Sequence, residues 1–216
     1  TFLTGLSAAS YSRILGANDR VGIGFIGYGL IGAQHVFDFK AQKDTDMVAM
    51  SEVYRPRLEQ GAEEMARAGQ PRPKQFTDFR KMLEDKDVEA VVVSTPDHWH
   101  ALMAMMACAA GKDVYVEKPM VQKVADGQRL VDAYQKSGRI LQVGSQRVSS
   151  VVYQKAKELI AAGAIGQLNM VEAWWDRNSA QGAWQYSIPL DASPQTVDWD
   201  RFLGSAPKRE FDAKRI

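Results

Sequence analysis

Apolar residues follow two alternating patterns between residues 20 and 147. Short runs rich in β-branched residues alternate with longer runs in which apolar residues recur every three or four positions. The first pattern predicts strands over 21–27, 46–52, 88–95, 113–117 and 140–144. The second predicts helices over 30–42, 55–69, 77–85, 98–111 and 124–138. Continuously apolar strands that alternate with helices are typical of parallel sheets covered on both faces, so we predict a doubly wound α/β fold.

The chain after residue 146 contains fewer predicted elements, and only one of them is a strand. The same pattern predicts a helix over 149–163, one long strand over 166–178 and a short helix over 197–204. A single strand cannot form a sheet, because its backbone groups need partners on a neighbouring strand. We therefore expect a complete domain over 20–146 and the incomplete start of a second α/β domain over 147–216.

The first 19 residues lie outside the alternation. They are mildly apolar, and the small residues of "LGA" at 15–17 are spaced as at a signal-peptidase site. The start "TFLTGLSAAS" resembles the part of a twin-arginine signal that follows its two arginines, and it is too short and polar to span a membrane. This segment predicts export to the periplasm without membrane insertion. A helix or arm packed on the domain of a cytoplasmic protein is the alternative.

Composition places the chain among soluble globular proteins. Hydrophobic residues make up 45% and charged residues 25%, and the formal net charge is +1. This balance gives no support to nucleic-acid binding. The single cysteine, Cys108, excludes a disulfide framework and lies in an apolar helical run, where we expect a packed thiol.

Glycines follow the first predicted strand in two overlapping registers, Gly22-Gly24-Gly27 and Gly27-Gly29-Gly32. Only the second has a strand before it and a helix opening within it, which is the context in which a pyrophosphate binds at a helix N-terminus. In that register Gly27 would make the tight turn and Gly29 would let the backbone approach phosphate. Gly32 would let the helix and strand pack closely.

Glu52 ends the second predicted strand, twenty residues after Gly32. A carboxylate there can accept hydrogen bonds from the adenosine ribose hydroxyls and repels a 2′-phosphate, which predicts NAD as the cofactor. Arg55 and Arg57 follow closely and offer an NADP-tolerant alternative. A solvated Glu52 that caps the next helix is the purely structural alternative.

Three motifs, "GFIGYGLIGAQHV", "STPDHWH" and "YVEKPM", occur in this order over most of residues 20–147. Together they resemble the glucose-fructose oxidoreductase / inositol dehydrogenase (Gfo/Idh/MocA) family, and "GSQRVSS" and "VDWDRFLG" resemble its bacterial members. The resemblance implies a Rossmann domain that binds a nicotinamide cofactor. It also implies a following α/β domain whose sheet forms the floor of a sugar or polyol site, and we expect a homo-oligomer for the full-length protein.

The resemblance also implies roles for single residues. Those expected to contact the cofactor are Gly27, Tyr28, Gly29, Leu30, Ile31 and Gly32 at the pyrophosphate, Glu52 at the ribose, Ser94, Thr95, Pro96, His98 and His100 at its middle, and Glu117, Lys118 and Gln146 around the nicotinamide. Those expected to contact the carbohydrate substrate are Lys118, Arg147 and Trp174.

Lys118 is the expected catalytic residue, because the strand over 113–117 would present it where the substrate carbon meets the nicotinamide. An alcohol gives up hydride more readily as its proton leaves, and an ammonium that is hydrogen-bonded to its oxygen stabilises the developing alkoxide. Pro119 would fix the turn that aims this side chain. A salt-bridged strand end at the surface is the structural alternative.

Two aromatic patterns admit more than one interpretation. His98 and His100 alternate as metal ligands can, but zinc needs a third ligand, and His35 lies on the helix after the glycine loop, so we expect no metal. Trp174 and Trp175 would face opposite sides of the predicted strand. One of them would stack on a sugar ring, or both belong to a core or interface.

Three functions are compatible with these residues. The first is net hydride transfer to or from a sugar or polyol, and the second is a glycosidase or lyase that recycles bound NAD in place. The third is a non-catalytic dinucleotide sensor. The resemblance implies that a later region supplies an acid and a histidine for proton transfer. No histidine follows His100, so we expect the general base to be absent and the 216-residue chain to show little turnover by itself.

Overall fold

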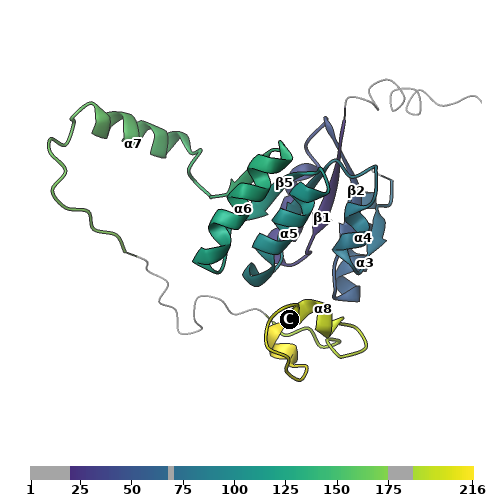
Figure 1. Ribbon diagram of the computed structural model, residues 1–216. Helices are drawn as coiled ribbons and strands as arrows, with labels where there is room; N and C mark the ends of the chain where they lie inside the picture. The colour runs from purple at the N-terminus through teal and green to yellow at the C-terminus, as the bar shows by residue number, and fades with distance from the viewer. Residues whose placement is uncertain (1–19, 68–70, 175–186) are drawn as a thin grey trace, which may run out of the picture. The chain divides into compact units, whose positions relative to one another are not determined.

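A computed structural model describes residues 20–67, 71–174 and 187–216 (Figure 1). The predicted export segment over 1–19 and Trp175 lie outside these residues, and export stays a prediction. The chain forms two units. The first contains the residues up to Gly144 together with Ser193–Phe211, and the second contains Ser145–Ala192 and Asp212–Ile216. Residues 193–211, which the sequence pattern placed in the second domain, thus pack with the first unit.

Six parallel strands form one sheet in the order β3-β2-β1-β4-β5-β6. Their bounds are β1 Val21–Ile26, β2 Thr45–Ser51, β3 Lys74–Phe76, β4 Ala90–Val93, β5 Asp113–Glu117 and β6 Leu141–Gly144. The order reverses between β1 and β4, as in dinucleotide-binding folds. The predicted doubly wound Rossmann-type sheet is confirmed. The pattern missed β3, because its three residues "KQF" contain no apolar run.

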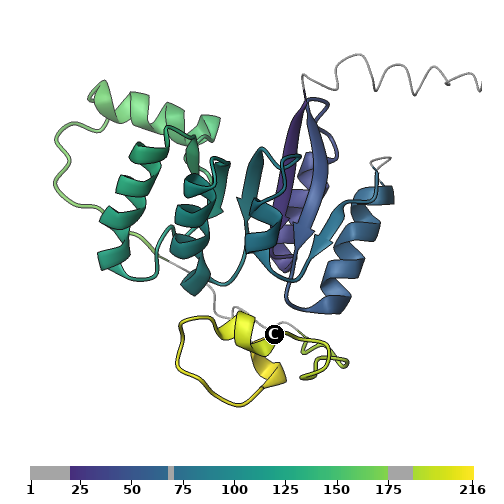
Figure 2. The same ribbon diagram turned by 45° about the vertical axis from the view of Figure 1, so that its right-hand side comes forward.

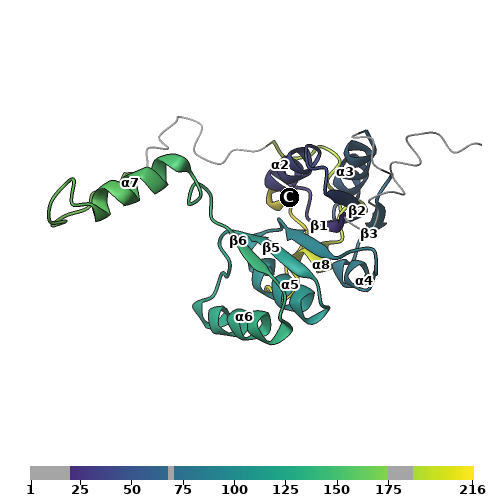
Figure 3. The same ribbon diagram turned by 90° about the horizontal axis from the view of Figure 1, so that it is seen from above.

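Helices cover both faces of this sheet, and Figure 3 shows α2 and α3 on one face and α5 and α6 on the other. Their bounds are α2 Leu30–Phe39, α3 Arg55–Arg67, α4 Phe79–Leu83, α5 Asp97–Ala109 and α6 Val124–Ser137. Helices α5 and α6 lie side by side (Figure 2). Within the described ranges, none of the helices has the length and apolar character that crossing a membrane requires.

Two apolar clusters join the helices to the sheet. On the α2 and α3 face, Val36, Leu58 and Met65 pack with inward side chains of β1 and β2. On the opposite face, the cluster contains residues of α4, α5 and α6 together with Val91 and Val93 of β4. Burial of apolar surface on both faces explains why the strands are almost continuously apolar.

Helix α7, Val151–Ala161, belongs to the second unit. Helix α8, Trp199–Leu203, belongs to the first. A short 3-10 helix, η1, covers Ala213–Arg215. The predicted strand over 166–178 is wrong for residues 166–174, which form no strand. A strand needs a hydrogen-bonding neighbour, and none of the described residues pairs with this segment. Trp174 is 76% exposed there.

Candidate functional site

The carboxyl ends of four neighbouring strands meet at one edge of the sheet. Ser51 pairs with Ile26, Ile26 with Val93, and Val93 with Val116, so these four residues lie in one row. Each is followed directly by a predicted site residue, namely Glu52, Gly27, Ser94 and Glu117. The register therefore brings together residues that the sequence separates by up to 90 positions. Ligands of open α/β sheets bind at this edge, where the strand order reverses.

The glycine loop between β1 and α2 has the geometry of a phosphate cradle. Gly27 adopts a positive φ of 92°, and a Cβ on it would lie 2.9 Å from the carbonyl oxygen of Ser94. A Cβ on Gly32 would collide with the carbonyl of Gly27. A Cβ on Gly29 would meet no atom within 4 Å. Gly27 and Gly32 are thus required by packing, whereas the space beside Gly29 is open to a ligand.

Helix α2 starts beside this open space. Gly29 is its N-cap, and none of the described side chains caps the first turn. The N–H groups of that turn can therefore donate to an acceptor from outside the helix, and the helix dipole adds partial positive charge. An open glycine next to an uncapped helix N-terminus fits the pyrophosphate of a dinucleotide.

Glu52 connects the second strand to the glycine loop. Its Oε2 accepts a 2.8 Å hydrogen bond from the N–H of Tyr28, and its Oε1 accepts from the N–H groups of Val53 at 2.7 Å and Tyr54 at 3.0 Å. Three donors thus fix a half-buried carboxylate at the edge of the cradle. A carboxylate can accept further hydrogen bonds at its remaining lone pairs, so ribose hydroxyls can still bind to it.

Glu117, at the end of β5, is only 3% exposed. Its Oε1 lies 2.9 Å from Nε2 of His35 on α2, and its Oε2 accepts a 3.2 Å hydrogen bond from the N–H of Lys118. Burial, and then the negative charge of Glu117, raise the pKa of Tyr115, whose ring contacts that of His35. Lys118 itself is exposed at the sheet edge, and its contact with a substrate stays a prediction.

His98 and His100, which the resemblance places at the middle of the cofactor, both contact backbone carbonyls. The ring of His100 is buried, with Nδ1 2.8 Å from the oxygen of Pro119 and Nε2 2.7 Å from that of Thr95. It thereby joins the loops that follow β4 and β5. Nε2 of His98 lies 2.9 Å from the oxygen of Phe202. Their contact with the cofactor stays a prediction.

The other predicted site residues divide between the two units. The hydroxyl of Ser94 is buried without a hydrogen-bond partner among the described residues, below the cradle. Gln146, Arg147 and Trp174 belong to the second unit, so their predicted roles stay predictions. In the part of the chain that the structure describes, no group of three or more His, Cys, Asp or Glu side chains is arranged to hold a metal ion.

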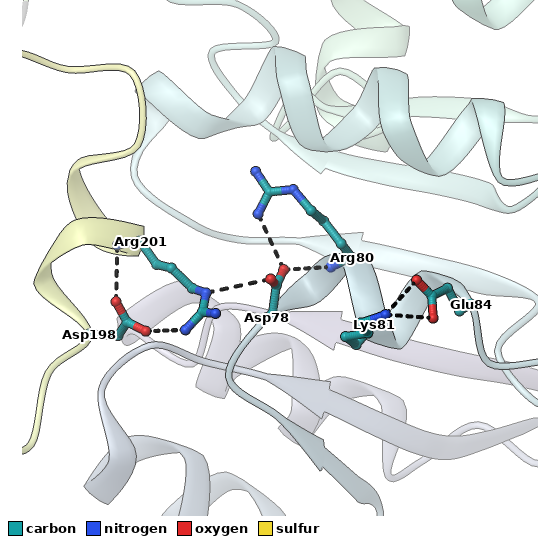
Figure 4. Close-up of polar contacts among 6 residues, drawn as sticks. All are labelled: Asp78, Arg80, Lys81, Glu84, Asp198 and Arg201. Atoms are coloured by element: carbon teal, nitrogen blue, oxygen red, sulfur yellow. Dashed lines mark hydrogen bonds and ion pairs between the residues drawn. The ribbon is translucent and has the colours of Figure 1, made fainter.

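Residues 193–211 form a second layer of contacts that the sequence pattern did not predict. Val197 makes an antiparallel bridge with Tyr54, and the carbonyl of Phe202 accepts a 2.8 Å hydrogen bond from the indole of Trp99. Arg201 on α8 reaches Asp78, at 3.5 Å, and also pairs with Asp198 (Figure 4). The "VDWDRFLG" motif is the only sequence signal for these contacts.

Comparison with known proteins agrees with this geometry. Residues 21–145 match the family model GFO_IDH_MocA, described as an oxidoreductase family with an NAD-binding Rossmann fold. Inositol 2-dehydrogenase of Salmonella typhimurium is 33% identical over 150 residues, which cover 68% of this chain and 44% of that protein. A glycosyl hydrolase family 109 protein of Shewanella baltica is 28% identical over 163 residues, covering 72% of this chain and 35% of the relative.

The solved structures that resemble this chain include scyllo-inositol dehydrogenase of Lactobacillus casei with bound NAD(H) and scyllo-inositol. It superposes with a TM-score of 0.62 at 25% identity, and the match covers 68% of this chain and 42% of that one. The chain spans less than half the length of these relatives. Because the family model matches more than half of the chain, the protein belongs to the Gfo/Idh/MocA family of NAD-binding oxidoreductases.

Proposed function

We propose that the protein containing this chain transfers hydride between NAD and a hydroxyl-bearing carbon of a sugar or polyol. The observation that supports this most is the strand register, which places the glycine cradle, Glu52 and the Glu117-Lys118 pair along one sheet edge. Bound there, the nicotinamide would supply the hydride acceptor or donor.

Glu52 selects the cofactor in this proposal. Its carboxylate accepts hydrogen bonds from ribose hydroxyls and repels a 2′-phosphate, so NAD binds more tightly than NADP. The three backbone N–H groups that donate to the carboxylate keep it oriented toward the cradle. The guanidinium of Arg57 lies over the ring of Tyr54, 5.3 Å from its centroid, and Arg55 is exposed nearby. These two cations would give NADP a weaker second mode of binding.

Lys118 acts at the substrate oxygen. Its ammonium donates a hydrogen bond to the hydroxyl oxygen and stabilises the alkoxide that develops as the hydroxyl proton passes to a general base of the full-length protein. Loss of hydride from the carbon of that alkoxide would leave the carbonyl product. Glu117 does not compete for that position, because His35 holds one of its carboxylate oxygens inside the fold. The two residues thus have different roles in this proposal. Glu117 holds the backbone N–H of Lys118 at the strand end, and the side chain of Lys118 contacts the substrate.

The substrate class follows from the relatives. Salmonella typhimurium inositol 2-dehydrogenase and the Lactobacillus casei enzyme solved with scyllo-inositol both point to a cyclic polyol or sugar. Because this chain spans less than half of either protein, we propose the substrate class for the full-length protein.

The test is NADH formation at 340 nm by full-length protein with a panel of polyols and aldoses. Lys118→Gln should lower kcat/KM by at least about a hundred-fold, the usual contribution of one group that stabilises a developing oxyanion. Lys123→Gln, an exposed lysine five residues away, is the matched control and should retain activity. Equal activity of wild type and Lys118→Gln would refute the catalytic role of Lys118.

Cleavage of glycosides with in-place recycling of NAD is the second candidate, and the family 109 relative supports it. The same panel, extended with aryl glycosides, separates the two functions. Release of the aryl group without net change at 340 nm would favour the glycosidase. Accumulation of NADH with free polyols would favour the dehydrogenase.

A further inference from the structure

Segment 196–198 pairs with the backbone that carries Glu52. The N–H of Asp198 donates to the carbonyl of Val53, and the N–H of Arg55 donates to the carbonyl of Thr196, both at 2.9 Å. These two hydrogen bonds flank the antiparallel bridge between Tyr54 and Val197. Both bridge residues are only 3% exposed, so the pairing is shielded from bulk solvent.

One peptide group lies at the centre of this arrangement. The carbonyl of Val53 and the N–H of Tyr54 belong to the same planar unit. The carbonyl end accepts from Asp198, and the N–H end donates to Oε1 of Glu52 at 3.0 Å. The orientation of the Glu52 carboxylate is therefore linked through one rigid plane to the backbone of Asp198.

Contacts beyond the pairing hold the segment in place. The guanidinium of Arg201 pairs with Asp78 in the loop before α4, as Figure 4 shows. The indole of Trp99 donates to the carbonyl of Phe202, and Leu203 is 5% exposed. A Cβ on Gly204 would collide with the ring of Trp99, so the chain lies directly on α5.

We propose that segment 196–198 is a positioning element for cofactor selection, which holds Glu52 toward the adenosine ribose and thereby sets the preference for NAD over NADP. This inference rests on the proposed role of Glu52. If the Asp198 N–H is removed, the peptide plane between Val53 and Tyr54 can rotate, and Glu52 loses one of its three donors. The carboxylate then binds the ribose less well and repels a 2′-phosphate less strongly.

Proline substitutions with matched alanine controls test the backbone bonds separately from the side chains. Asp198 has a φ of −75°, which proline adopts, and the extended bridge at Val197 is compatible with a following proline. Asp198→Pro removes the N–H and the side chain, whereas Asp198→Ala removes only the side chain. Arg55 is the first residue of α3, where proline is tolerated, so Arg55→Pro and Arg55→Ala form a second pair.

The measurement is the ratio of the dissociation constants for NADP and NAD, by calorimetric titration of each folded variant. We expect the ratio to fall about five-fold in each proline variant relative to its alanine control, as for the loss of one hydrogen bond. A merely structural role would weaken binding of both cofactors in parallel. If one proline variant does not fold, the other pair decides.

Equal ratios in the proline and alanine variants would overturn this inference. Glu52→Gln in the same titration separates that outcome from failure of the proposed function. A wild-type preference for NAD that Glu52→Gln removes, with no effect of either proline, would refute only the role of segment 196–198. A wild type that binds both cofactors equally would overturn the role of Glu52 and this inference together.

Discussion

At the scale of single residues, the glycines of the β1–α2 loop have different physical reasons to be glycine. Gly32 lies under the carbonyl of Gly27 with no space for a side chain, whereas Gly29 faces open space. A side chain at Gly32 would therefore disturb folding, whereas a side chain at Gly29 would interfere only with a bound ligand. Substitution of Gly32 therefore tests stability, and substitution of Gly29 tests ligand binding.

Gly32→Ala should destabilise the first unit by about 2 kcal/mol or more, because the new methyl group must displace backbone in the loop. Gly127→Ala is the matched control in α6. A Cβ there meets no atom within 4 Å, so the helix should gain stability by about 0.5–1 kcal/mol. Urea unfolding followed by circular dichroism measures both. A stable Gly32→Ala protein would contradict the close packing of the loop.

The buried contact between His35 and Glu117 gives a second prediction at this scale. His35→Ala should cost about 2 kcal/mol or more, because it leaves a carboxylate oxygen of Glu117 buried and without its partner. Gln34→Ala, an exposed neighbour on α2, should change stability by no more than about 0.5 kcal/mol.

A double-mutant cycle makes the pairing test quantitative. In a Glu117→Gln background the carboxylate is gone, so His35→Ala should cost less than in the wild type. The difference between the two free energies of unfolding is the coupling energy. An identical cost in both backgrounds would show that the two side chains do not interact.

At the scale of elements, α4 and α8 are joined by charge. Burial opposes ionisation of Asp78, but hydrogen bonds from the backbone and side chain of Arg80, with the charges of Arg80 and Arg201, outweigh it (Figure 4). Together they hold the pKa of Asp78 below its usual range. The contact is partly exposed, so its contribution is screened by solvent and salt.

The pKa shift predicts how this contact depends on pH. A carboxyl whose pKa is lower in the folded than in the unfolded protein contributes stability above its unfolded pKa and loses it as pH falls through the folded pKa. Asp78→Asn should therefore lower the melting temperature at pH 7, and the difference from wild type should shrink below about pH 4. A difference that stays constant down to about pH 3 would contradict the ion-pair account.

Elements formed by local patterns were predictable, and contacts between distant segments were not. The strand–glycine–helix pattern and Glu52 lie within 32 residues, so spacing alone predicted the loop and the strand end correctly. The partner of Glu117 is His35, 82 residues away, and no local pattern reveals it. The three-residue β3 was missed because it pairs at the edge of the sheet by backbone hydrogen bonds rather than by an apolar run.

The wrong strand prediction in the second unit also concerns a contact between distant segments. Residues 166–174 have the apolar character of a strand, but strand formation depends on a neighbour that the described residues do not provide. Segment 196–198 is the opposite case. Its sequence predicted no strand, yet it pairs with residues 53–55, because a short bridge needs only two backbone hydrogen bonds and a buried side chain.

At the scale of the whole molecule, the first unit carries a sheet edge that brings together the glycine cradle, the carboxylate of Glu52 and the side chain of Lys118. The family match over residues 21–145 covers the sheet and stops near the end of β6. The returning segment 193–211 adds contacts that the match does not include. We therefore expect cofactor binding to be a property of this unit, while the choice of substrate is a property of the full-length protein.

Calorimetric titration of NAD into wild type and Gly29→Ala tests the central claim, that the dinucleotide binds at the carboxyl edge of the sheet, most directly. Gly29 has an ordinary φ of −78° and open space beside it, so the substitution should leave the melting temperature nearly unchanged. The new methyl group would occupy the position of the pyrophosphate, so NAD affinity should fall by at least about ten-fold. Unchanged NAD affinity in a folded Gly29→Ala protein would contradict the account.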